Sequence, residues 1–174
     1  MNFLVVIEDN RGSVHRMSKE AIAGAQILGG NVTALVLGAN AESLAQELSS
    51  IEIDKTLIVN HDMVLTYNSD GYTEVVTKVI QSIDPDVIIA GHSYQTRDFM
   101  PRVSARLDIP FISDVIMVDG NDYTKQVLNA KLNCTISSSS EKKILSFQSA
   151  CFSEEDMQSG SSDYQTIDID LDSS

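Results

Sequence analysis

The sequence predicts an α/β domain in which a mostly parallel sheet is covered by helices on both faces. Short apolar runs rich in β-branched residues recur along the first 118 residues, and several are long enough for a strand buried on both sides. Segments with helical periodicity separate these runs, so consecutive parallel strands are joined by crossover helices. Together these observations predict a three-layer, Rossmann-like arrangement.

The strands are the apolar runs, and the helices are bounded by capping and breaking residues. Ser18 is the expected cap of the first helix, Gly29 stops that helix, and Asp84 with Pro85 ends the helix over residues 72–83. In order, the expected elements are strand 3–7, the helix from Ser18 to Leu28, strand 32–37, helix 41–48, strand 56–59, helix 72–83, strand 86–91, loop 92–96, a helix through Leu107, and strand 112–118. In helix 72–83, we expect Val75, Val76, Val79, Ile80 and Ile83 to face inward.

The pattern changes after Thr124, where no helix separates two strand-like segments. Residues 126–135 and 143–150 flank the serine-rich turn 137–140, which predicts a C-terminal antiparallel β-hairpin that extends the sheet. We therefore place the folded domain at residues 1–152. Residues 153–174 contain seven Asp or Glu residues and no Lys or Arg, so we expect an acidic linker or tail.

Composition narrows the classes of function. The net charge of −13 disfavours nucleic-acid binding, because such surfaces need clustered Lys and Arg. No apolar run approaches the length of a membrane-spanning helix, so we expect no direct membrane insertion, and cytoplasm is the default compartment. Cys134 and Cys151 have no metal-ligand spacing, and we expect both to be buried thiols.

The search for catalytic, cofactor-binding and metal-binding residues assigns none. Dinucleotide binding needs several glycines after the first strand, whereas residues 8–12 read EDNRG and contain only one. Glu8 and Asp9 lie at the carboxyl edge of the sheet, where they could bind a metal or a ribose, or could simply be solvated. His15, His61 and His92 lie in expected loops and fit either ligands or ordinary loop residues.

A cationic stripe is the candidate partner interface. Arg102 and Arg106 lie four residues apart on one helical face, and Arg97 extends the stripe. Three of the twelve basic residues within ten positions indicate contact with a carboxylate-rich partner surface or, alternatively, with acidic groups of the same domain.

The stretch that contains this stripe also carries a family resemblance. Residues 96–107 read TRDFMPRVSARL, and residues 108–115 read DIPFISDV. This resembles the amino-terminal domain of the electron transfer flavoprotein alpha subunit, where Gly-Arg/Lys-Asp-Leu-x-Pro-Arg-Val/Leu-Ala-Ala-Arg/Lys-Leu precedes a Ser-Asp pair and a strand. Similarity also covers the opening strand and helix, residues 82–91 and the late strand-like segments. Two departures are Thr96 in place of glycine and the absence of a Tyr-Ala-Gly-Asn run from residues 126–131.

The resemblance implies a scaffold and docking domain that is not an enzyme. Such alpha subunits pair with a beta subunit, and the complex carries electrons through FAD from acyl-CoA and other dehydrogenases to a membrane quinone oxidoreductase. A second domain of the family carries most FAD contacts, and we expect it to be absent here, so we expect no cofactor on this chain alone. The implied location is bacterial cytoplasm, or the mitochondrial matrix if a transit peptide has been removed.

A second interpretation keeps the architecture and changes the function. Adenine nucleotide alpha hydrolase-like domains share these layers, so the chain could be a stand-alone adenine-nucleotide-binding domain of the universal-stress type. The missing phosphate-loop glycines argue against it. A third interpretation is an enzyme that uses Glu8, Asp9 and His92, and it requires those side chains to converge in space.

Overall fold

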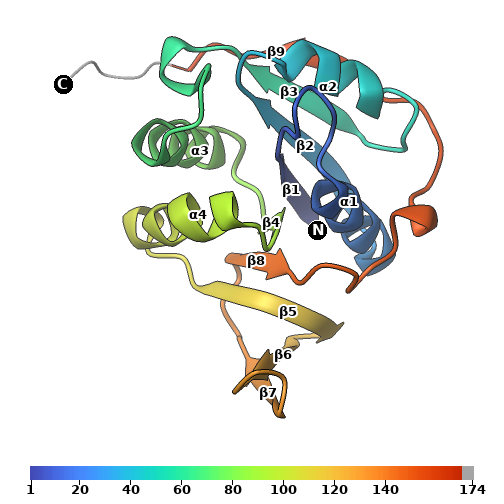
Figure 1. Cartoon of the computed structure of the whole chain (residues 1–174), viewed down its shortest axis with the longest axis vertical. Helices are drawn as coiled ribbons and strands as arrows, with labels where there is room; N and C mark the ends of the chain where they lie inside the picture. Colours follow the sequence, from blue (N-terminus) through green and yellow to red (C-terminus); the bar gives the residue numbers. More distant parts are fainter. Residues whose placement is uncertain (170–174) are drawn as a thin grey trace.

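The computed structural model describes residues 1–169, which form a nine-stranded sheet with two layers of helices (Figure 1). The strand order is β7-β6-β5-β8-β4-β1-β2-β3-β9. The strands are β1 (Asn2–Ile7), β2 (Asn31–Leu37), β3 (Lys55–Val59), β4 (Val87–Gly91), β5 (Phe111–Asp119), β6 (Asp122–Val127), β7 (Leu132–Ser137), β8 (Lys143–Phe147) and β9 (Tyr164–Thr166). The helices are α1 (Arg16–Leu28), α2 (Ala41–Leu48), α3 (Ser69–Ile83) and α4 (Tyr94–Leu107), with short 3-10 turns η1 (Asp62–Val64) and η2 (Glu154–Asp156).

The predicted three-layer, mostly parallel fold is confirmed. Alternate side chains of β1 enter opposite layers: Phe3, Val5 and Ile7 pack with α1 and α2, whereas Leu4 and Val6 pack with α3 and α4. Figure 1 shows α1 and α2 on one side of the central strands and α3 and α4 on the other. Because both faces are covered, the central strands are apolar on both faces, which is why the sequence shows unbroken apolar runs.

The predicted pairing of the late hairpin is wrong. Residues 143–150 do not pair with residues 126–135; instead β8 lies parallel between β4 and β5, with Ile144 in register with both Ile88 and Phe111. The antiparallel strands are β5, β6 and β7, in which β6 pairs with both neighbours. Burial explains this arrangement: every residue of β8 is buried, as a central strand requires, whereas every residue of β7 is exposed at the sheet edge.

Three helices begin earlier than expected. His15 caps α1, since its Nδ1 accepts a hydrogen bond from the Met17 N–H at 3.1 Å, and Ser18 is buried inside the helix. Asn68 caps α3 and Ser93 caps α4, so the expected loop 92–96 is largely helical. Within α3, four of the five residues expected to face inward are buried, whereas Ile83 is 36% exposed because the helix ends there.

The segment after β8 runs to the edge of the sheet opposite β7. β9 adds to β3 in parallel, and Ile51 forms an isolated bridge with Ser159. Residues 153–169 therefore contribute to the sheet, although the boundary near Phe152 stays a prediction. The last part of the predicted tail, residues 170–174, lies outside the described residues.

The expectation for the cysteines was also wrong. Cys134 is exposed on the edge strand β7, and Cys151 is only partly buried after β8. Both are free thiols.

Within residues 1–169, no helix combines the length and apolar composition that a membrane crossing requires.

Candidate functional site

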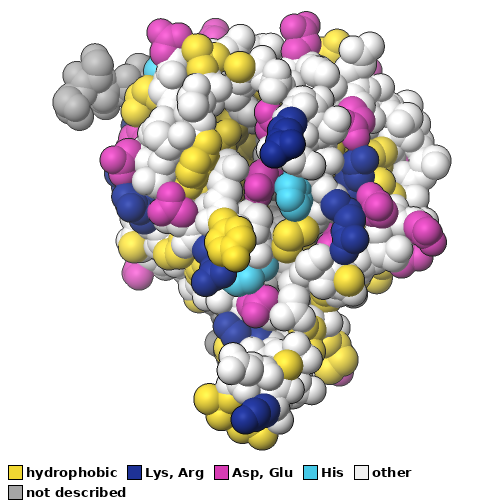
Figure 2. Space-filling view, in the orientation of Figure 1, with side chains coloured by type: hydrophobic (Ala, Val, Ile, Leu, Met, Phe, Trp, Pro, Cys, Tyr) yellow, Lys and Arg dark blue, Asp and Glu magenta, His cyan; other side chains and the backbone are white. Residues whose placement is uncertain are grey.

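A cleft of about 460 Å³ opens at the carboxyl edge of the parallel sheet. It lies beside the ends of β1 and β4, where the strand order reverses direction, which is the usual ligand position in open α/β sheets. Figure 2 shows basic, acidic and histidine side chains gathered near the middle of the face that it draws. The lining residues are Glu8, His15, Met17, His92, Ser93, Tyr94, Arg97, Asp114, Gln148 and Ser149.

Glu8 joins the end of β1 to the start of α4. Its carboxylate accepts a short hydrogen bond from the Ser93 hydroxyl, and the Ser93 Oγ accepts the Thr96 N–H at 3.1 Å. The backbone N–H of Glu8 donates to Ser18 Oγ at 2.9 Å. Glu8 is therefore held in place by hydrogen bonds to residues of two helices, and this fixes its position in the lining of the cleft.

His92 is a titratable residue in the lining of the cleft. Its Nδ1 lies 2.8 Å from the buried Ser146 Oγ, and its Nε2 lies 3.9 Å from Asp114 Oδ1. Burial lowers the pKa of His92, the Asp114 carboxylate opposes this shift, and the positive charges of Arg97 and Lys125 add to it. His92 is therefore biased toward the neutral imidazole.

A backbone irregularity in β5 aims Asp114 at this histidine. The register between β5 and β8 shifts between Ile112 and Val115, and Asp114 has a left-handed φ of 62°. The Asp114 N–H then donates to Ser146 Oγ at 3.1 Å, so Ser146 contacts both Asp114 and His92. Such bulges are frequent beside binding sites because they re-aim side chains.

The other candidate polar residues do not all converge. Asp9 is occupied elsewhere, because its carboxylate accepts the Gly12 N–H at 2.6 Å and the Asn40 amide at 2.7 Å. His61 caps η1. Only Glu8 and His92 of the proposed enzymatic trio line the cleft, and residues 1–169 contain no group of three His, Cys, Asp or Glu side chains arranged for a metal ion.

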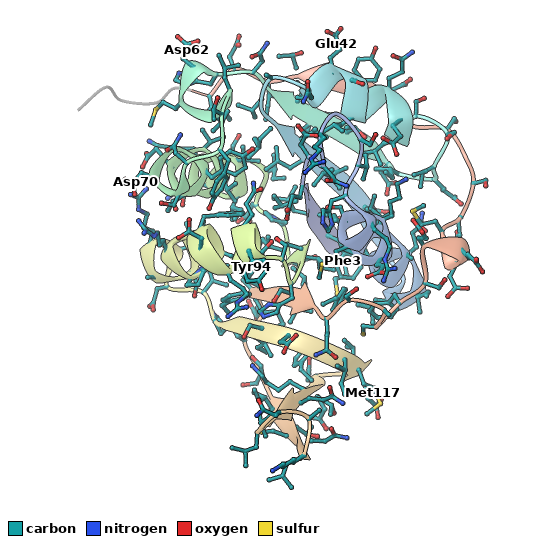
Figure 3. The ribbon with its side chains drawn as sticks, in the orientation of Figure 1. Phe3, Glu42, Asp62, Asp70, Tyr94 and Met117 are labelled. Carbon is teal, nitrogen blue, oxygen red and sulfur yellow. The ribbon has the colours of Figure 1, made fainter. Side chains whose placement is uncertain are left out.

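The three arginines of the cationic stripe face different partners. Arg102 forms an ion pair with Asp70 at 2.8 Å, and Arg106 pairs with Glu74, so both contact α3 of the same chain. Arg97 lies 5.6 Å from the centroid of the Tyr94 ring and lines the cleft. Figure 3 labels Tyr94, which is 88% exposed, at the first turn of α4.

Sequence reasoning missed Ser93, Ser146 and Asp114. Ser93 could have been found, because it follows an apolar strand by two residues and serine is a common helix cap. Ser146 gives no local signal inside the buried strand β8, and Asp114 becomes part of the site only through the bulge. Neither can be assigned without knowing that β8 lies between β4 and β5.

The described residues form no phosphate cradle at this cleft. Glu8 and Asp114 place two carboxylates there. Gly91, at the end of β4, is needed for close packing instead, because a Cβ added there would lie 2.5 Å from Met17 Cβ. The cleft can hold a polar group near a neutral imidazole, but its charge is unfavourable for a pyrophosphate.

Comparison with known proteins gives a consistent family. The family model described as "Electron transfer flavoprotein domain" matches residues 3–172. The chain is 34% identical over 134 residues to the electron transfer flavoprotein subunit alpha of Bacillus subtilis, which covers 74% of this chain and 41% of the relative. It is 30% identical over 151 residues to the probable mitochondrial electron transfer flavoprotein subunit alpha of Caenorhabditis elegans, covering 86% of this chain and 46% of that protein. The chain therefore spans less than half of the length of these curated relatives.

Proposed function

The chain belongs to the electron transfer flavoprotein domain family, and from that premise we propose that it is the amino-terminal scaffold and docking domain of an alpha subunit. In this role it packs against a beta subunit, and the assembled complex carries electrons through FAD from dehydrogenases to a membrane quinone oxidoreductase. The domain itself performs no catalytic step. The bacterial and mitochondrial names of its relatives support placement in the cytoplasm or the mitochondrial matrix.

The observation that carries this proposal is the exposed antiparallel extension formed by β5, β6 and β7. In Figure 1 the extension projects away from the helical layers, and Figure 2 shows hydrophobic side chains at its tip. Leu128, Leu132 and Ile136 are 68%, 57% and 37% exposed, respectively. An edge strand with apolar side chains and unpaired backbone groups is a favourable surface for another polypeptide.

The charges of the cleft support placing FAD outside this chain. Glu8 and Asp114 outnumber the one arginine of the cleft, Arg97, so the charge at this edge of the sheet opposes the flavin's pyrophosphate, and residues 1–169 offer no glycine-lined loop there. FAD supplies the electron-transfer chemistry when it is bound in the complex. In this proposal the domain positions the polypeptides that hold the flavin.

Arg97, Arg102 and Arg106 remain the proposed charged part of the docking surface. The ion pairs of Arg102 and Arg106 are solvent-exposed, so they cost little to rearrange when a partner carboxylate approaches. Arg97 has only the Tyr94 ring beside it among the described contacts of its guanidinium. It is therefore the first of the three to test.

The experiment is co-purification of the tagged chain with its beta subunit, with affinity measured by calorimetry. Leu132→Asp should weaken the complex by at least about tenfold, because a charge would be buried in an apolar contact. Met63→Asp is the matched control, since Met63 is 40% exposed on η1, which follows β3 toward the opposite end of the strand order from β7. Equal binding by both variants would contradict docking through the extension, and stoichiometric FAD on the isolated chain would contradict the scaffold role.

A further inference from the structure

A second cavity, of about 230 Å³, lies at the opposite edge of the sheet from the cleft. It is near the amino ends of three adjacent strands, because Phe3, Val87 and Lys143 occupy one row of the sheet in register. Figure 3 labels Phe3, which belongs to this row. The volume corresponds to roughly eight water molecules of liquid, so the cavity suits a ligand smaller than a nucleotide.

The walls of this cavity are mostly apolar. Phe3, Val87 and Leu145 contribute from the sheet, Leu28 from the last turn of α1, and Val118 from β5. These residues belong to the layer on the α1 side or pack against it. Such walls favour a hydrocarbon or aromatic group over a strongly hydrated one.

One buried cation interrupts the apolar lining. Lys143 is 6% exposed, and its Nζ has a single, long hydrogen bond to Asn121 Oδ1 at 3.4 Å. The Tyr123 ring centroid lies 5.7 Å away. None of the ion pairs among residues 1–169 includes Lys143. An ammonium carries three N–H donors, so this group retains unused hydrogen-bonding capacity while it is removed from water.

We propose that this cavity binds a small apolar monocarboxylate. The carboxylate accepts hydrogen bonds from Lys143 Nζ, and the hydrocarbon part packs on Phe3 and Leu28. One lysine neutralises one carboxylate, whereas a phosphate ester brings more charge and more oxygen atoms than the apolar walls can satisfy. The cavity adjoins the base of the proposed docking extension, since Val118 of β5 and Tyr123 of β6 line it, but the proposal that it binds a carboxylate does not depend on the proposed function.

Glu141 is the residue that opposes anion binding here. It also lines the cavity, but it is exposed, so water screens its charge more than it screens the buried lysine. This arrangement gives a directional test. Glu141→Gln should tighten carboxylate binding, whereas loss of the lysine should weaken it.

The experiment is titration of the ¹⁵N-labelled 174-residue chain with hexanoate, followed by amide chemical shifts. We expect saturable shifts centred on Phe3, Val118 and Lys143, with a dissociation constant on the order of 1 mM for so small a ligand. Lys143→Met should reduce affinity by at least about tenfold, because it removes a charge-assisted hydrogen bond. Lys142→Met is the matched control, since it removes the same charge from the neighbouring position and should bind as the parent does.

Two further measurements keep the test decisive. Hexan-1-ol should bind more weakly than hexanoate, because it lacks the charge that pairs with the ammonium. Val118→Phe keeps the lysine and fills the cavity, so it should abolish the shifts even if Lys143→Met does not fold. Absence of saturable shifts in the parent chain, or undiminished hexanoate binding by Val118→Phe, would overturn the proposal.

Discussion

Replacing Phe152 with alanine tests where the folded unit ends. The Phe152 ring packs edge-on against Phe147 of β8, with centroids 4.8 Å apart and ring planes at 63°. It also lies directly on the α1 backbone, since a Cβ added to Gly24 would be 2.7 Å from Phe152 Cδ2. The ring therefore joins the last residues of the predicted domain to both α1 and β8.

The expected loss follows from this partly buried position. Truncating a fully buried phenylalanine costs about 3–5 kcal/mol, and an aromatic pair contributes roughly 0.5–1.5 kcal/mol beyond its buried area. Because Phe152 is only partly buried, we expect Phe152→Ala to lower the free energy of unfolding by about 2–3 kcal/mol. For a chain of this size, that corresponds to a decrease in Tm of about 5–10 °C.

The assay is urea unfolding followed by far-ultraviolet circular dichroism, which is suitable because the chain has no tryptophan. Tyr94→Ala is the matched control: it also removes an aromatic ring, but from a position that is 88% exposed. Its unfolding free energy should change little. A loss below about 0.5 kcal/mol for Phe152→Ala would refute the reasoning and move the end of the folded unit toward β8.

Three more predictions concern packing, pH and thiol reactivity. Gly91→Ala should destabilise the fold by about 1–3 kcal/mol or more, measured by thermal unfolding, because the added Cβ meets Met17 at 2.5 Å; a stability equal to the parent would be inconsistent with that contact. The pKa of His92 is lowered in the folded chain, so the unfolded chain binds the proton first as pH falls below about 6.5, and stability decreases through that window. His92→Gln should therefore lose less unfolding free energy than the parent between about pH 7.5 and about pH 5.5, and an equal loss would argue against the shift. Burial raises the pKa of Cys151 to about 11, with a smaller contribution from the Glu20 carboxylate. Exposed Cys134 should thus react first with iodoacetamide, and fast labelling that survives Cys134→Ser would contradict this order.

The central strands could be predicted from sequence because their burial is two-sided. The apolar runs at residues 3–7, 32–37 and 86–91 correspond closely to β1, β2 and β4. A strand covered on both faces must be apolar along its whole length, so a continuous apolar run in the sequence is enough to predict it. Helix starts were less accurate, since His15 caps α1 through a ring nitrogen rather than through the side-chain oxygen that Ser18 suggested.

The pairing of β8 could not be predicted from its own pattern. Its neighbours β4 and β5 are separated from it by long stretches of chain. The hydrophobic periodicity of a strand indicates its secondary structure and burial, but it does not indicate which distant strand is its neighbour. The absence of a helix before β8 suggested a hairpin with the preceding strand. β9 was missed for a related reason, because Tyr164–Thr166 is short, polar and exposed, and its neighbour β3 is distant in sequence.

The candidate cleft was predicted only in part. Glu8 and His92 could be placed at the carboxyl edge, because each follows a strand whose direction is fixed by the parallel topology. The contact of His92 with Ser146 requires β8 beside β4, and Asp114 requires the bulge in β5. Arg102 and Arg106 were placed correctly on one helix, yet their contact with carboxylates on α3 depends on helix packing.

The position of β8 has a consequence for how the chain is made. During synthesis β4 and β5 emerge before β8, yet they are not neighbours in the finished sheet. Until residues 143–147 leave the ribosome, β4 and β5 each have one edge with unpaired backbone N–H and C=O groups. During that time the two strands could pair incorrectly, with each other or with another chain. The centre of the sheet is therefore completed late, when β8 inserts between β4 and β5. A nascent or truncated chain that stops before Lys143 exposes two unpaired strand edges, which can associate with other chains.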